Sequence, residues 1–139
     1  MDLEKSSLAQ HLSSSKYIVA LIGAGMSAPS GIPTYRDASS SSGLDTAWYA
    51  TRAASQEHPE AVWQYYNALR RTVYHASPNP AHYALARLAR LDDNFLAITQ
   101  NVDGDSQRAG HSRQLAELHG SLSTTKMLQR YMRPHHITR

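Results

Sequence analysis

The chain has 139 residues, of which 41% are hydrophobic and 18% charged, a balance typical of one globular domain rather than a disordered segment. The 14 Lys and Arg residues against 11 Asp and Glu give a net charge of +3, which is a weak signal for nucleic-acid binding. The absence of cysteine excludes disulfides, thiol nucleophiles and Cys-based zinc sites, and no apolar run is long enough to predict a transmembrane helix.

The N-terminal third begins with a predicted amphipathic helix at residues 1–15. The apolar run at 17–22 predicts a strand buried on both faces, as in a parallel sheet. The sequence GAGMSA follows this run at 23–28, and we expect a short helix from about Ser27. A G-x-G-x-x-A turn between a strand and a helix either brings backbone N–H groups to a pyrophosphate or is a plain turn. Asp45 has the spacing of a ribose-binding acid but lies in a Ser-rich stretch.

Two longer helices follow a predicted loop at 39–43. The first begins at Pro59, and one apolar face carries Val62, Tyr66, Leu69 and Val73. The second begins at Pro80 with Asn79 as its N-cap. Its predicted apolar face is made of Ala81, Ala84, Leu85, Leu88 and Leu91.

Two further apolar runs, at 95–99 and 115–118, predict buried strands. The first is followed by the polar segment QNVDG at 100–104, and the second by His119 and Gly120. Strands that alternate with helices predict an α/β fold with a parallel sheet, whose ligands bind at the carboxyl ends of the strands.

Three segments closely resemble the signature motifs of the sirtuins. The stretch at 23–37 is similar to the family's GAGxSxxSGIPxxR, TQNVD at 99–103 to its TQN[IV]D, and LHGS at 118–121 to its HG motif. The resemblance covers about residues 16–126. It implies a partial Rossmann-like parallel sheet, corresponding to the N-terminal half of a sirtuin catalytic domain.

The resemblance also implies a function, which is NAD-dependent removal of acyl groups from protein lysines with release of nicotinamide and O-acyl-ADP-ribose. His119 is then the general base, and a His pKa suits this task. Alternatives remain open for two groups, because Arg36 could pair with Asp37 or Asp45 and the segment after 99 could be a plain Asx turn. The implied cofactor-binding residues are Gly23, Ala24, Gly25 and Ser27 at the phosphates, Pro33, Tyr35 and Arg36 in a closing loop, and Gln100, Asn101 and Asp103 at the nicotinamide and its ribose.

Ala28 and the stretch at 63–71 resemble the sirtuin subgroup that removes malonyl and succinyl groups, which binds the acidic acyl end with a Tyr-x-x-Arg pair. Here Leu69 stands three residues after Tyr66, and Arg70 stands four after it. Helical neighbours at either spacing share a face. Tyr66 and Arg70 are therefore candidate substrate-binding residues, or else Tyr66 is core and Arg70 extends along the surface.

The chain departs from the family pattern in three ways. Asp105 and Ser106 follow Gly104 where the family usually has an apolar-led pair, the Cys ligands of the family's zinc module are missing, and the second half of the sheet is missing. We expect residues 1–126 to be a partial, truncated catalytic domain and 127–139 a basic tail outside the family pattern. We therefore expect weak NAD binding and poor turnover, and the alternative is a non-catalytic NAD- or ADP-ribose-binding module or a dominant-negative fragment.

The expected partner is an acyl-lysine protein, without a role for a membrane or nucleic acid. The lack of cysteine, and the acidic residues ahead of the first apolar run, favour an intracellular protein. Cytoplasm or nucleus is favoured, and the mitochondrion is compatible.

Overall fold

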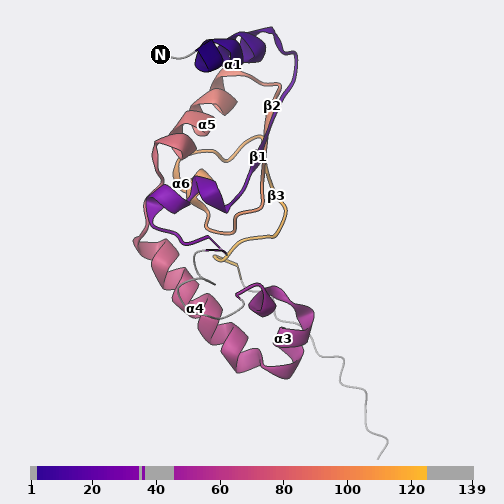
Figure 1. The fold of residues 1–139 in the computed structure, drawn as a ribbon, viewed down its shortest axis with the longest axis vertical. Coiled ribbons are helices and arrows are strands. Elements are labelled where there is room, and N and C mark those ends of the chain that lie inside the picture. Colours follow the sequence, from indigo (N-terminus) through magenta and orange to yellow (C-terminus); the bar gives the residue numbers. More distant parts are fainter. Residues whose placement is uncertain (1–2, 35, 37–45, 125–139) are drawn as a thin grey trace, which may run out of the picture.

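The computed structural model describes residues 3–34, 36 and 46–124. Predictions for Tyr35, the loop at 39–43, Asp45 and the tail at 127–139 lie outside these residues. Within them, no helix combines the length and the apolar character needed to cross a bilayer. The elements are α1 (Leu3–Ser14), β1 (Ile18–Ile22), the 3-10 helices η1 (Ala24–Met26), η2 (Ala28–Ser30) and η3 (Trp48–Ala50), α3 (Arg52–Glu57), α4 (Pro59–His75), α5 (Pro80–Leu91), β2 (Phe95–Thr99), α6 (Asp105–Arg108) and β3 (Leu115–Glu117) (Figure 1).

The three strands form one parallel sheet in the order β1-β2-β3. Ile22 at the end of β1 lies opposite Thr99 at the end of β2, and Thr99 lies opposite Glu117 at the end of β3. The carboxyl ends therefore meet at one edge, and the polar segments that follow the strands are gathered there. The predicted α/β fold with a parallel sheet is confirmed.

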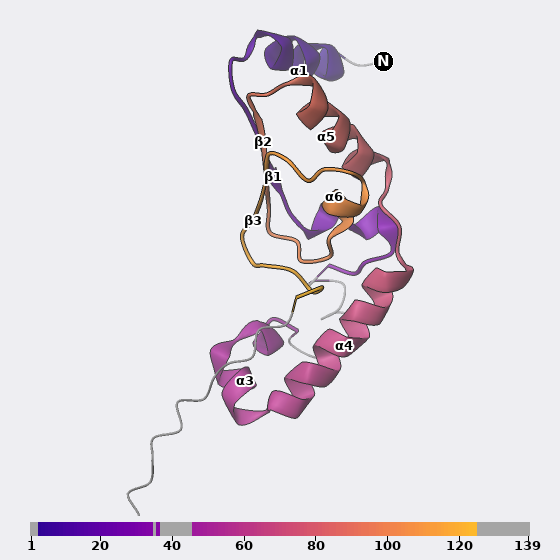
Figure 2. The same cartoon turned by 180° about the vertical axis from the view of Figure 1, so that it is seen from behind.

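Only one face of the sheet is covered by the described residues, so the prediction that the strands are buried on both faces is wrong. Along β1, Ile22 is buried, whereas Val19 and Leu21 are 63% and 68% exposed. Figures 1 and 2 show α5 and α6 on the same side of the sheet, with no described helix on the other. An apolar strand indicates that its residues suit burial, but it does not specify which segment covers them.

The core lies between the covered face of the sheet and α5. Ile22, Phe95 and Ala97 form its buried centre, and seven partly buried apolar residues pack against them: Ile18, Ala20, Met26, Leu85, Leu88, Ala89 and Leu115. Phe95 is the largest of the three and is 2% exposed. The alternation of Ile18, Ala20 and Ile22 toward α5 follows from the two-residue period of a strand.

The predicted helix starts are confirmed, whereas some predicted faces are wrong. α4 begins at Pro59 and α5 at Pro80, with the Asn79 side chain accepting the N–H of Ala81 at 3.0 Å. On α5, however, Leu91 is 73% exposed, and the buried positions are His82 and Ala86. In the predicted amphipathic helix α1, Leu8 is exposed. The short helix predicted from Ser27 is instead a pair of 3-10 turns, η1 and η2.

α3 and α4 form an arm below the sheet in both views (Figures 1 and 2). The upper end of α4 lies just below α6, on the side of the carboxyl ends of the strands. This arrangement brings residues of the arm to the edge where the predicted site residues are gathered.

Candidate functional site

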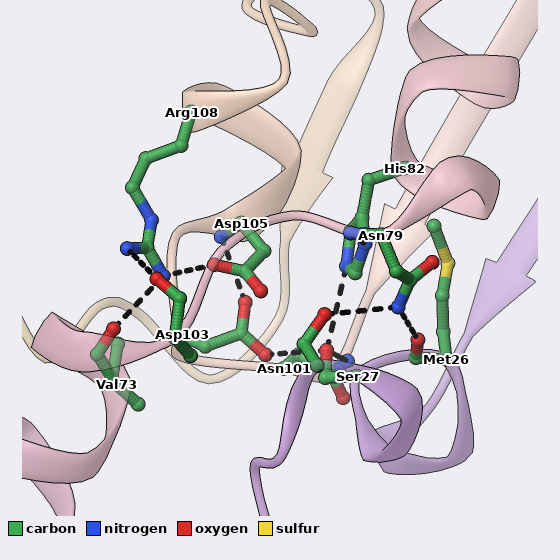
Figure 3. A network of polar contacts seen from close by, with 11 residues as sticks. Met26, Ser27, Val73, Asn79, His82, Asn101, Asp103, Asp105 and Arg108 are labelled. Atoms are coloured by element: carbon green, nitrogen blue, oxygen red, sulfur yellow. Dashed lines mark hydrogen bonds and ion pairs between the residues drawn. The ribbon is translucent and has the colours of Figure 1, made fainter.

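Ser27 is at the centre of a hydrogen-bond network that joins the glycine turn to the segment after β2. Its side chain is 1% exposed and donates to Oδ2 of Asp103 at 2.7 Å. Asn101 Nδ2 donates both to the Ser27 hydroxyl at 3.1 Å and to the Gly23 carbonyl at 3.0 Å. Figure 3 shows these side chains converging from the two segments. The structure thus brings together three residues that the sequence predicted for one site.

His82 belongs to the same network, although no sequence motif pointed to it. It stands at the third position of α5, where its Nδ1 accepts the backbone N–H of Asn79 at 3.2 Å in a capping box. A neutral imidazole with an accepting Nδ1 carries its proton on Nε2, so Nε2 donates to Ser27 Oγ across 3.5 Å. The signal in the sequence was a polar residue three positions after the N-cap Asn79.

The directions of these hydrogen bonds also bear on metal binding. His82, Asp103 and Asp105 each offer an atom within 4.8 Å of the others, a spacing compatible with cation ligands. A ligating imidazole nitrogen must be free of its proton. Since Nδ1 already accepts a backbone N–H, Nε2 holds the proton and is not available as a ligand in this arrangement.

The predicted cofactor residues line one small cavity of about 70 Å³ at the carboxyl edge. Six of them contribute to its wall: Ala24, Ser27, Pro33, Gln100, Asn101 and Asp103. A Cβ atom placed on Gly23 or Gly25 would have no atom within 4 Å, so the backbone of the turn faces open space beside the cavity. A dinucleotide would need such an open backbone for its phosphates. Arg36 is exposed, and Tyr35 lies outside the described residues.

His119 lies at the end of β3, beside the segment after β2. Its Nδ1 is 2.9 Å from the carbonyl oxygen of Gln100. Because a carbonyl only accepts, Nδ1 carries the proton, and Nε2 is the unprotonated nitrogen of the neutral ring. The contact therefore fixes the tautomer that a general base requires.

A larger cavity, of about 730 Å³, is lined by His119 together with Tyr66 and Arg70 of α4. The structure thus brings the two candidate substrate-binding residues to the same cavity as the predicted base. Arg70 donates from Nε to the carbonyl of Leu122 at 3.1 Å, and its guanidinium lies 5.0 Å from the centre of the Trp63 ring. Arg70 Nη1 is buried and has no hydrogen-bond partner among the described residues. Arg70 therefore faces the cavity rather than extending into solvent.

Asp105, at the position where an apolar residue was expected, is 0% exposed and forms an ion pair with Arg108 (Figure 3). Arg108 also donates to the carbonyls of Ala76 at 2.8 Å and Val73 at 3.0 Å, at the end of α4. These bonds add acceptor contacts at the end of α4, where carbonyl groups have few intrahelical partners. The pair connects the segment after β2 to the arm that carries Tyr66 and Arg70.

Residues 23–133 match the model of the Sir2 family. An NAD-dependent protein deacylase of Thermus thermophilus is 47% identical over 118 residues, covering 81% of this chain and 46% of that protein. The NAD-dependent protein deacylase 1 of Archaeoglobus fulgidus is 44% identical over 126 residues, covering 86% of this chain and 49% of that protein. The chain therefore spans about half the length of these curated relatives.

Solved structures of Sir2 homologues also share the fold of this chain. A Sir2 homologue mutant in complex with 2'-O-acetyl ADP ribose superposes with a TM-score of 0.76 and 42% identity, covering 94% of this chain and 51% of that one. A complex of a Sir2 homologue with NAD gives a TM-score of 0.71 and 43% identity, covering 87% and 46%. The sheet is thus the Rossmann-like sheet of these proteins. The family match extends into residues 127–133, so the boundary proposed at 126 stays a prediction.

Proposed function

Since this chain belongs to the Sir2 family, we propose that it supplies the cofactor-binding and general-base half of an NAD-dependent protein-lysine deacylase site. The observation that carries the proposal is the contact between His119 and the Gln100 carbonyl at 2.9 Å. It orients an unprotonated Nε2 in a cavity that adjoins the predicted cofactor residues. NAD, when bound, supplies the electrophilic ribose carbon that accepts the acyl oxygen of the substrate lysine.

The residues of this chain divide the remaining tasks. His119 Nε2 takes a proton from a ribose hydroxyl, since it is the free acceptor of the ring. Asn101 and Asp103 hold the carboxamide end of the cofactor, because buried amide groups are selected by paired donors and acceptors. Ser27 keeps Asp103 oriented through its 2.7 Å hydrogen bond. The products of the completed reaction are nicotinamide, O-acyl-ADP-ribose and a free lysine. None of the 139 residues is a cysteine that could ligate the zinc ion of the family's module.

This function is tested by NMR titration of the full chain with NAD and by nicotinamide release in the presence of an acetyl-lysine peptide. We expect weak binding that shifts the signals of Ser27 and Asn101, with slow release that His119→Ala abolishes. His75→Ala is the matched control, because His75 is exposed at the end of α4. NAD that shifts neither signal, or release that survives His119→Ala, would contradict the proposal. Binding without any release reassigns the chain to the non-catalytic NAD-binding alternative.

We further propose that the larger cavity prefers acidic acyl groups, with Arg70 binding the distal carboxylate and Tyr66 beside it. Supporting this preference are their shared cavity with His119 and the unpartnered Nη1 of Arg70. A guanidinium binds a carboxylate through paired N–H groups. Binding of succinyl- and acetyl-lysine peptides is compared in Arg70→Gln and in the exposed control Arg71→Gln. We expect the succinyl preference to fall about tenfold or more in R70Q only, and an equal loss in R71Q would refute the assignment.

A further inference from the structure

A third cavity lies apart from the carboxyl edge, between the end of α5 and the segment that joins α6 to β3. It encloses about 300 Å³, and its polar lining residues are Arg90, Asp93, His111, Ser112, Arg113 and Gln114. This segment runs beside α5, on the covered side of the sheet and toward the amino ends of the strands (Figures 1 and 2). None of these residues belongs to the site described above.

His111 is the most unusual group in this cavity. Its side chain is 1% exposed and stacks on Phe95 with ring centroids 5.8 Å apart. Neither Nδ1 nor Nε2 has a hydrogen-bond partner among the described residues. The Gln114 carbonyl accepts the N–H of Ala97 at 2.8 Å; it is close enough to raise the pKa of His111 but makes no hydrogen bond of ordinary geometry to a ring nitrogen. A buried polar group without a partner is costly, so a ligand that pairs with His111 would remove that cost.

The charges around His111 are mainly positive. Arg90 and Arg113 line the cavity from two different elements, with Asp93 as the one acidic residue in its lining. Among the described residues, neither arginine forms an ion pair. Arg90 Nη1 lies 3.6 Å from the position that a Cβ atom would take on Gly110, whose φ is 85°. A larger residue at 110 would be strained and would contact the guanidinium.

We propose that this cavity binds a phosphate group, either as free inorganic phosphate or carried on a phosphorylated side chain. Arg90 and Arg113 provide the balancing charge, while the Ser112 hydroxyl and one ring N–H of His111 donate hydrogen bonds. Guanidinium groups match the geometry of phosphate oxygens. A cation is excluded by the two arginines, and an apolar ligand would leave the imidazole nitrogens unpaired.

The protonation of His111 provides an additional readout. Burial lowers the pKa of His111, the Gln114 carbonyl acts in the opposite direction, and the Arg90 guanidinium again lowers it. The charged groups that line the cavity around the ring are Arg90, Asp93 and Arg113. A bound phosphate adds negative charge and favours the protonated ring, so phosphate should raise the pKa of His111.

The test follows the ring signals of His111 by NMR while inorganic phosphate is added to the full chain in a phosphate-free buffer. We expect saturable shifts, an affinity lowered about tenfold or more in Arg90→Gln and Arg113→Gln, and no change in Arg87→Gln. Arg87 is the matched control because it is exposed on the same helix and does not line the cavity. A parallel titration with O-phosphoserine distinguishes a phosphorylated side chain, which would bind more tightly, from a free ion.

Shifts that never saturate, or that weaken equally in R87Q and R90Q, would overturn the proposal, as would unaffected His111 signals. The arginine variants keep the test interpretable, since both side chains are exposed and neither substitution removes core volume. Phosphate also has a predicted binding place at the glycine turn, so a shift confined to Gly23 and Gly25 counts against this cavity.

Discussion

Arg108→Ala removes the connection between the segment after β2 and the end of α4. The side chain contributes an ion pair to Asp105 and hydrogen bonds to the carbonyls of Val73 and Ala76. Its removal leaves the Asp105 carboxylate, which is 0% exposed, without its counter-charge. Oδ2 of that carboxylate already has no partner among the described residues, so nothing nearby replaces the lost guanidinium.

The size of the loss in stability depends on how deeply the Asp105 and Arg108 side chains are buried. Removing one partner of a fully buried pair costs about 3–5 kcal/mol. The Arg108 side chain is 36% exposed, so solvent screens part of the interaction. We expect a loss of about 2–3 kcal/mol in the free energy of unfolding, a substantial part of the roughly 5–15 kcal/mol of a whole domain.

Urea unfolding followed by circular dichroism measures this loss, with Arg87→Ala on the exposed face of α5 as the control. Asp105→Asn keeps the shape of the side chain and removes its charge. The double variant R108A/D105N should therefore recover at least about 1 kcal/mol relative to R108A alone, because the pair is coupled. A loss below about 1 kcal/mol in R108A, or strictly additive effects in the double variant, would show that the pair is not the link inferred here.

Three further variants probe the core, the cap and the buried imidazole. Phe95→Ala removes the largest side chain of the core cluster, so the free energy of unfolding should drop by about 3–5 kcal/mol in urea titrations; a drop below about 1 kcal/mol would mean that α5 does not pack there. Asn79→Ala should lower the free energy of unfolding by about 1–2 kcal/mol. It should also speed amide hydrogen exchange near Met26, because the Met26 carbonyl accepts a hydrogen bond from Asn79 at 2.7 Å. Unchanged exchange would contradict this contact between α5 and the glycine turn. Because folding lowers the pKa of His111, the unfolded state takes the proton first, so stability is complete above about the ordinary value of 6.5 and falls as the pH drops below it. His111→Gln should flatten this dependence in thermal melts over that range, and an unchanged slope would assign it to other groups.

Much of the fold was predictable because it depends on local sequence. The strand at Phe95–Thr99 and the helix start at Asn79 and Pro80 follow from composition and capping chemistry within a few residues. The approach of Asn101 and Asp103 to Ser27 also followed, since parallel strands bring their carboxyl ends to one edge. The approach of these residues could be predicted from the order of the strands and helices along the chain.

The missed features depend on segments that are distant in the sequence. Val19 and Leu21 have the composition of covered strand residues, yet their exposure depends on which other part of a chain packs on that face. The burial of His82 and His111 was not predicted, because it arises from contacts of α5 and of the segment before β3. The Asp105–Arg108 pair is the exception. It had a local signal in the sequence, because residues three apart on a helix are neighbours.

The Ser27 network has a consequence for how the molecule folds. Its hydrogen bonds between the glycine turn and the segment after β2 join residues separated by 74 to 78 positions, as in Ser27–Asn101 and Gly23–Asn101. Contacts of this separation form only after the chain between them has been closed into a loop, which slows folding. During synthesis, α5 can contact the glycine turn through Asn79 and His82 first, whereas the bonds from Asn101 and Asp103 that complete the network can form only after Asp103 has left the ribosome.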